Sequence, residues 1–270
     1  MKLPLSIPFR LRHFFKKCYD SNYRHYHQEW QRIRKIPRYQ HGETEIEGAR
    51  FEFVDSISFL AMRESIFQNE IYQFKSKSES PLILDGGANV GLSIRYFKKI
   101  YPKSRIIGFE PDPKIFKVLE RNCRELEGVE LHACALWKEN GFLNFNSEGS
   151  DAGTLMDTDR AKTKIQVPTI RLRDYLQESV DFLKLDIEGA EGEVLSDCAE
   201  RLNQVSNLFV EYHGFVDRDP DLSKLLGTLE SASFRYHIDS DLISPKPFMQ
   251  RHVRAGMDST LNISAYRKTE

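Results

Sequence analysis

The segment with the clearest chemical potential is DGGANVG at residues 85–91, which follows an apolar run, PLIL, and precedes an amphipathic stretch over residues 92–100. Gly87 and Gly91 allow the backbone to turn sharply and let a ligand approach where a Cβ would obstruct it. The helix that follows offers free N–H groups and partial positive charge at its N-terminus, which suits an anionic group. The segment therefore predicts a nucleotide-type loop between a strand and a helix.

The type of ligand follows from the residues between the glycines. The dinucleotide pattern G-x-G-x-x-G would need glycine at positions 89 and 92, where this chain has Asn89 and Leu92, and the P-loop Lys-Ser/Thr pair is missing. Asp85 would repel a pyrophosphate, but it can pair with a ligand ammonium. A ligand that combines an ammonium, a carboxylate and an adenosine is S-adenosylmethionine. The alternative is a tight glycine turn that binds nothing.

A second acidic position is Glu110, which ends the apolar run RIIGF and lies 25 residues after Asp85. An acid at a strand end can accept hydrogen bonds from both hydroxyls of a ribose. Pro111 and Asp112 follow as further candidates for the cofactor site. Asp112 has a second interpretation as the N-cap of a helix that begins at Pro113.

A third cluster of charge is KLDIEGAE at residues 184–191. Strand alternation would place Lys184, Asp186 and Glu188 on one side, which is costly unless the three face a cleft or pair with one another. Asp186 is then a candidate for orienting an acceptor, for acting as a base, or for holding a divalent cation such as Mg²⁺. The alternative is a structural network of the lysine with the acids, with Glu191 as a first-turn helix acid.

The fourth candidate is His213 in the run EYH at residues 211–213. An imidazole there could serve as a general base near neutral pH, although a structural histidine fits the same position. The catalytic candidates are therefore Asp186, His213 and Glu188, with Lys184 as their cationic partner.

These residues need a scaffold of alternating strands and helices. Apolar runs at residues 81–87, 105–110, 129–136, 180–188 and 207–213 predict core strands. Amphipathic stretches at residues 92–100, 113–126, 189–202 and 222–231 predict helices. This order is typical of an α/β fold with a doubly wound, mainly parallel sheet, whose ligand lies at the carboxyl ends of the strands. The runs at 141–146 and 164–170 alternate and predict peripheral strands, and those at 234–239 and 260–267 predict the last strands.

Taken in order, the motifs LILDGGANVG, IGFEPDP, CALW, VPTIRLRDYL, VDFLKLDIEGAEGEVL and LFVEYH resemble the FkbM-type family of S-adenosylmethionine-dependent methyltransferases. The resemblance spans roughly residues 45–267. It implies a Rossmann-like class I methyltransferase sheet of seven strands, the last antiparallel, and methylation of hydroxyls on sugars, glycolipids or secondary metabolites. The cofactor positions that it implies, together with the neighbouring glycine, are Asp85, Gly86, Gly87, Asn89, Gly91, Glu110 and Asp186. Ala135 falls where adenine usually lies.

Other functions fit less of the sequence. A non-catalytic S-adenosylmethionine-binding module or partner protein stays open as an alternative. A nicotinamide oxidoreductase is disfavoured by the two missing glycines. A nucleic-acid methyltransferase is disfavoured because the motif of amino-methylating enzymes is absent and the body of the chain is acidic, so the expected acceptor is a small molecule or a glycan.

The 270 residues carry 39 Lys/Arg and 40 Asp/Glu, so the chain is not a general polyanion binder. Ten of those basic residues lie within the first 40 positions beside only two acids. We therefore expect a basic helical extension or cap at residues 1–44 and a methyltransferase domain at 45–270. Residues 9–19 mix aromatic and basic side chains, which could contact an anionic membrane surface. The alternative that we favour for this segment is a cap helix packed on the core with solvated basic side chains. The expected location is cytoplasmic, with membrane association as the second option, and the four cysteines are expected to be free thiols.

Overall fold

The seven-stranded sheet at the centre of the protein has the strand order β11-β12-β10-β9-β3-β4-β5. The computed structural model describes residues 21–147, 163–242 and 244–267. The strands of this sheet are β3 (Leu82–Gly86), β4 (Arg105–Phe109), β5 (Val129–His132), β9 (Val180–Leu185), β10 (Val205–Phe215), β11 (Arg235–Ser240) and β12 (Met257–Tyr266). Only β12 runs antiparallel to its neighbours, which confirms the predicted class I arrangement.

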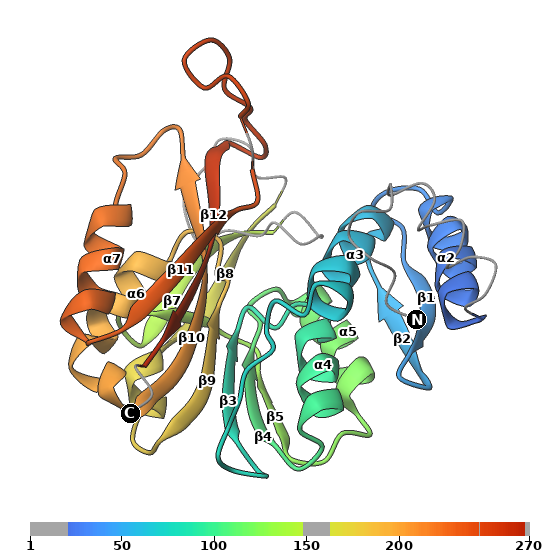
Figure 1. The fold of residues 1–270 in the computed structure, drawn as a ribbon, viewed down its shortest axis with the longest axis horizontal. Coiled ribbons are helices and arrows are strands. Elements are labelled where there is room, and N and C mark those ends of the chain that lie inside the picture. The colour runs from blue at the N-terminus through green and yellow to red at the C-terminus, as the bar shows by residue number, and fades with distance from the viewer. Residues whose placement is uncertain (1–20, 148–162, 243, 268–270) are drawn as a thin grey trace, which may run out of the picture.

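Helices cover both faces of this sheet, so the fold is doubly wound (Figure 1). One face carries α4 (Leu92–Ile100) and α5 (Pro113–Cys123), and the other carries α6 (Glu191–Cys198) and α7 (Leu222–Ser231). Each face has its own cluster of buried apolar side chains. Strand order reverses beside β3, so the carboxyl ends of β3, β4 and β9 open onto one crevice.

The N-terminal elements pack on the α4–α5 side of the molecule (Figure 1). They are α2 (Ser21–Arg34), β1 (Gly42–Ile46), β2 (Ala49–Phe53) and α3 (Ser56–Arg63). Ile33 of α2 is fully buried in the same apolar cluster as the sheet residues Ile83 and Phe182. The predicted membrane-contacting segment, residues 9–19, lies outside the described residues. The predicted domain boundary at residue 44 falls inside β1 and stays a prediction.

Two predicted strands differ from those observed. The run at 129–136 divides into β5 and β6 (Ala135–Trp137), and β6 joins β7 (Gly141–Ser147) and β8 (Thr163–Arg171) in a separate sheet. The run predicted at 180–188 leaves the sheet after Leu185, because Glu188 and Gly189 both adopt positive φ angles that end a strand. Strand alternation therefore ends at Leu185, although Lys184, Asp186 and Glu188 still line one cleft, as predicted.

Within the described part of the chain, no helix has the length and apolarity needed to cross a bilayer.

Candidate active site

The glycine loop between β3 and α4 is held tightly against its neighbours. The amides of Gly87 and Ala88 donate to the carbonyl of Phe109 at 3.0 and 2.9 Å. Gly87 has a φ of +76°, and a Cβ at this position would lie 1.8 Å from the carbonyl oxygen of Asp186. The loop therefore requires glycine at position 87 for two independent reasons, a left-handed backbone and direct contact with the end of β9.

Glu110 links the glycine loop to the turn after β4. Its carboxylate accepts hydrogen bonds from the amides of Asn89 at 3.0 Å and Asp112 at 2.9 Å. The residue is 7 % exposed, and burial raises the pKa of its carboxyl to about 7. A carboxylate held by two backbone amides at a strand end still has lone pairs that can accept from the hydroxyls of a ligand.

A pocket opens beside Glu110, which we call the loop pocket. Its wall combines apolar side chains with the carboxylates of four acidic residues. The residues that define it include Gly87, Asn89, Glu110, Pro111, Asp112, Ile115, Cys134, Ala135, Leu136, Phe145, Asp186 and Glu188. Asp112 also caps α5, since its side chain accepts from the amides of Lys114 and Ile115. Ala135 lines this pocket because the chain turns out of the main sheet between β5 and β6.

Asp85 points away from the loop pocket. Its fully buried carboxylate accepts a short hydrogen bond from the Ser93 hydroxyl and lies 3.2 Å from the Lys184 ammonium. Lys184 also donates to the carbonyls of Gly86 and Gly87, at 3.2 and 2.8 Å. Asp85 thus holds the loop through Lys184, and its contact with a ligand ammonium stays a prediction.

Lys184 is a buried cation at the base of the site. Burial lowers the pKa of its ammonium, but Asp85 and Asp186 together more than offset that effect and raise it above its ordinary value. Asp186 lies 3.4 Å from the ammonium and keeps a side-chain exposure of 26 %. Lys184 therefore stays charged and neutralises part of the negative charge that gathers here.

A larger cleft of about 860 Å³ adjoins the loop pocket, and we call it the acidic cleft. Gly87, Asn89, Asp186 and Glu188 line both spaces. Polar residues of three strands line the acidic cleft, namely Lys184, Glu211, His213, Thr260 and Asn262. Asp186 and Glu188 thus stand at the junction of the two spaces.

His213 is almost fully enclosed by carboxylates. Its Nδ1 lies 3.0 Å from Glu191, and its Nε2 lies 3.6 Å from Glu188 and 3.7 Å from Glu211. Burial lowers the pKa of the imidazole, but Glu188, Glu191 and Glu211 outweigh it and raise the pKa well above its ordinary value. The surrounding carboxylates therefore favour the protonated imidazole, which has no free lone pair to accept a proton.

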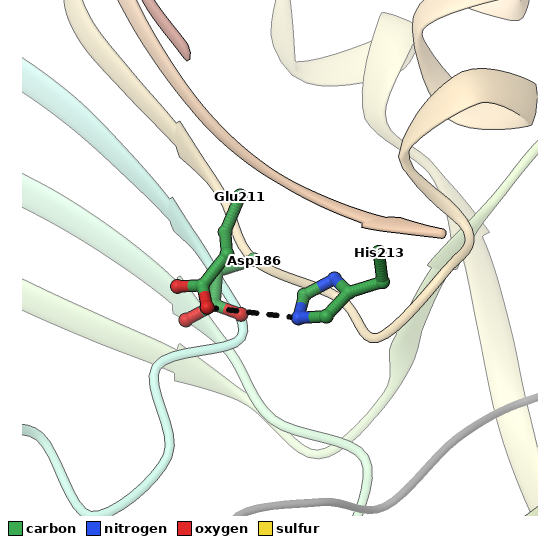
Figure 2. A group of neighbouring side chains, drawn as sticks. All are labelled: Asp186, Glu211 and His213. Atoms are coloured by element: carbon green, nitrogen blue, oxygen red, sulfur yellow. Dashed lines mark ion pairs between the residues drawn. The ribbon is translucent and has the colours of Figure 1, made fainter. Parts of the chain in front are cut away.

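Glu188 and Glu211 complete the group around Asp186. Figure 2 shows Asp186, Glu211 and His213 directed toward one another, with the Glu211–His213 ion pair drawn as a dashed line. Burial raises the pKa of Glu211 to about 8 and that of Glu188 well above its ordinary value, and the neighbouring acids add to both shifts. Burial and the neighbouring acids thus favour the neutral form of both carboxyls, which is a poor proton acceptor.

The structure brings two further residues into this group, Glu211, to which sequence reasoning gave no role, and Glu191, which it expected only at the first turn of a helix, where it does lie. Glu191, expected as a first-turn helix acid, is 1 % exposed and accepts from the amides of Ile187 and Gly189 as well as meeting His213. Glu211 lies two residues before His213 on β10, so alternation places both on one face. That i, i+2 spacing was the sequence feature from which Glu211 could have been identified as a site residue.

Known proteins resemble this chain along most of its described length. The family model described as Methyltransferase FkbM domain matches residues 85–236, which is more than half of the chain. Methyltransferase 1 of Beauveria bassiana (strain ARSEF 2860) is 29 % identical over 206 residues, which cover 66 % of this chain and 82 % of that protein. Methyltransferase sdnD of Sordaria araneosa is 30 % identical over 209 residues, covering 62 % and 80 %.

A third relative is the 2-O-methyltransferase NoeI of Sinorhizobium fredii (strain NBRC 101917 / NGR234). It is 29 % identical over 153 residues, which cover 49 % of this chain and 63 % of that protein. The matched segment of the family model begins at Asp85 and runs through β4, β9 and β10, so it contains the loop pocket and the group around Asp186. The chain is therefore a member of the FkbM family of S-adenosylmethionine-dependent methyltransferases.

Proposed function

We propose that the protein transfers the methyl group of S-adenosylmethionine to a hydroxyl oxygen of a sugar, glycan, glycolipid or secondary metabolite. The observation that supports this best is the junction of the loop pocket with the acidic cleft at Asp186. In a displacement at a methyl carbon, the attacking oxygen approaches opposite the leaving sulfur, so the cofactor and the acceptor must bind in adjoining spaces. The relative whose name specifies 2-O-methylation supports oxygen as the acceptor atom.

The loop pocket suits the cofactor chemically. Glu110 would accept from the ribose hydroxyls, and the apolar wall of Ile115, Leu136 and Phe145 would pack against adenine. The cofactor, when bound, supplies an electrophilic methyl carbon on a sulfonium. The Asp85 carboxylate already contacts Ser93 and Lys184, so its role is to fix the backbone of the glycine loop. Other atoms of the loop would then contact the amino-acid portion of the cofactor.

Asp186 is the residue that we assign as general base. Asp186 lies 3.4 Å from the Lys184 ammonium, keeps a side-chain exposure of 26 %, and lines both the loop pocket and the acidic cleft. His213 and Glu188 are more deeply buried, and their surroundings raise the pKa of both groups. The acceptor O–H bond breaks toward Asp186, and the oxygen lone pair forms the new bond to carbon. The bound cofactor would supply the methyl carbon and keep the electron pair of the broken S–CH₃ bond on sulfur, so the products would be a methyl ether, a neutral thioether and one proton on Asp186.

The Asp186→Asn variant tests this assignment. We expect methyl transfer to fall about 10²- to 10⁴-fold, the usual contribution of a positioned base, while the affinity for S-adenosylmethionine changes little. The measurement is transfer of labelled methyl groups to a panel of hydroxylated sugars and metabolites, with calorimetry for the cofactor. Asp239→Asn, at an exposed position on β11, is the control and should keep the wild-type rate. Equal rates for Asp186→Asn and wild type would refute the assignment.

The pH dependence of cofactor binding tests Glu110. The ribose hydroxyls would donate to the ionised carboxylate, and its pKa is about 7 in the free protein. The affinity for S-adenosylmethionine should therefore be greatest above pH 7 and weaken up to about tenfold per unit as the pH falls below it. Glu110→Gln should bind S-adenosylmethionine weakly at every pH, because its amide NH₂ would face a backbone N–H. Its affinity should also no longer depend on pH in this range. Calorimetry across about pH 6–8 measures both, and identical slopes in the two proteins would contradict the role.

A further inference from the structure

We propose that Asp186, Glu211 and His213 bind a divalent cation of the Mg²⁺/Mn²⁺ class on the floor of the acidic cleft. One ligand atom from each of the three side chains lies within 4.8 Å of the others. Ligands about 2.1–2.2 Å from a shared ion lie roughly 3–4 Å apart, so small side-chain rotations complete the site. Two carboxylates with one imidazole suit a hard cation that retains water ligands.

The contact between His213 and Glu191 also supports a metal site. Glu191 is an acceptor for two backbone amides, so the Nδ1 hydrogen of His213 is donated to it at 3.0 Å. That contact fixes the tautomer in which Nε2 carries a lone pair toward Glu211 once its proton is displaced. Histidines that ligate metals almost always donate their other ring N–H in this way to a carboxylate.

Two buried oxygens beside these ligands lack partners. Thr260 is 1 % exposed, and within the described residues neither its hydroxyl nor the Asn262 side-chain oxygen has a hydrogen-bond partner. Thr260 pairs with His213 across β10 and β12, and Asn262 pairs with Glu211, so these side chains share one face and line the acidic cleft. Oxygens in these positions can accept hydrogen bonds from water ligands of a cation.

The local charge also favours a cation. Asp186, Glu188, Glu191 and Glu211 gather around one imidazole, and the ammonium of Lys184 is shared between Asp85 and Asp186. Buried carboxylates at these separations repel one another unless protons or a metal ion compensate. A divalent cation would neutralise two of the charges at once.

The catalytic consequence rests on the proposed function, whereas the binding itself does not. A cation bound here would lie in the acidic cleft beside Asp186, where the acceptor hydroxyl is expected. It would lower the pKa of that hydroxyl and orient its oxygen. Asp186 has two carboxylate oxygens, so one can ligate the cation while the other takes the proton.

The test is titration of the chelator-treated full chain with Mn²⁺ alone. Binding is measured as the loss of the free-Mn²⁺ signal in electron paramagnetic resonance. We expect one saturable site in wild type and at least a tenfold weaker one in Glu211→Gln and His213→Gln. Glu191→Gln leaves all three ligands in place and should weaken binding about 10–100-fold through the imidazole. His237→Gln is the matched control, since His237 and Asp239 form an exposed pair at 3.1 Å on β11.

Calorimetry with S-adenosylmethionine on the same samples separates the two proposals and shows that each variant is folded. A protein that binds the cofactor but shows no saturable Mn²⁺ site would overturn the metal proposal alone. Mn²⁺ binding that is unchanged in both ligand variants would overturn it too, because the site would lie elsewhere. Loss of cofactor binding with the Mn²⁺ site intact would overturn the proposed function and leave the metal site standing.

Discussion

Replacing Lys184 with methionine should lower the free energy of unfolding by about 3–5 kcal/mol, the range found when one member of a buried ion pair is removed. Lys184 is 2 % exposed, and its ammonium lies 3.2 Å from the fully buried carboxylate of Asp85. Methionine keeps most of the side-chain volume, so the change isolates the charge. Asp85 would then be buried with only the Ser93 hydroxyl as a close side-chain donor.

The double variant Asp85→Asn with Lys184→Met is the matched test. It removes both charges, so it should be more stable than Lys184→Met alone, and the double-mutant cycle gives the coupling. Urea unfolding at pH 7.5 measures all four proteins, with equal m-values as the check on two-state behaviour. A double variant no more stable than the single one would show that the ion pair does not hold the loop.

Replacing Gly87 with alanine should abolish measurable binding of S-adenosylmethionine and destabilise the protein by several kcal/mol. The new Cβ would lie 1.8 Å from the carbonyl oxygen of Asp186, a backbone atom that cannot rotate away. Relief of this clash requires the glycine loop and the end of β9 to separate, and both line the loop pocket and the acidic cleft. Thermal unfolding and cofactor calorimetry measure the two effects.

Gly48 provides a control with the same backbone strain. Its φ of +78° nearly equals the +76° of Gly87, but no atom lies within 4 Å of a Cβ built on it. Gly48→Ala should therefore cost only the 1–2 kcal/mol of a left-handed alanine and leave cofactor binding intact. If the two variants behaved alike, the close approach of Gly87 to Asp186 would not matter.

The positions of the strand-end acids could be predicted because of a topological rule. Glu110 and Asp186 end strands that lie on either side of β3, and the carboxyl ends of parallel strands meet at one edge. The apolar runs were long enough to mark those ends, and the capping role of Asp112 followed from Pro113. The last strand was expected to be antiparallel from the family resemblance, and β12 is.

The partners of the buried charges could not be predicted in the same way. Lys184 pairs with Asp85 across two adjacent strands, in a register that depends on the whole sheet. The spacing of residues along the sequence does not specify that register. The break between β5 and β6 has a similar origin. His132 and Ala135 belong to one apolar run, and only tertiary pairing of β6 with β8 divides it.

The place of β12 in the sheet affects how the protein is made. β12 is the last strand in the chain, yet it lies between β10 and β11, which leave the ribosome before it. A nascent chain released through Ser240 contains every residue that lines the loop pocket but lacks Thr260 and Asn262 of the acidic cleft. Until β12 is translated, one edge of β10 has no strand to pair with and is open to chaperones or to other chains. Vectorial synthesis thus supplies every residue of the loop pocket before the last residues of the acidic cleft.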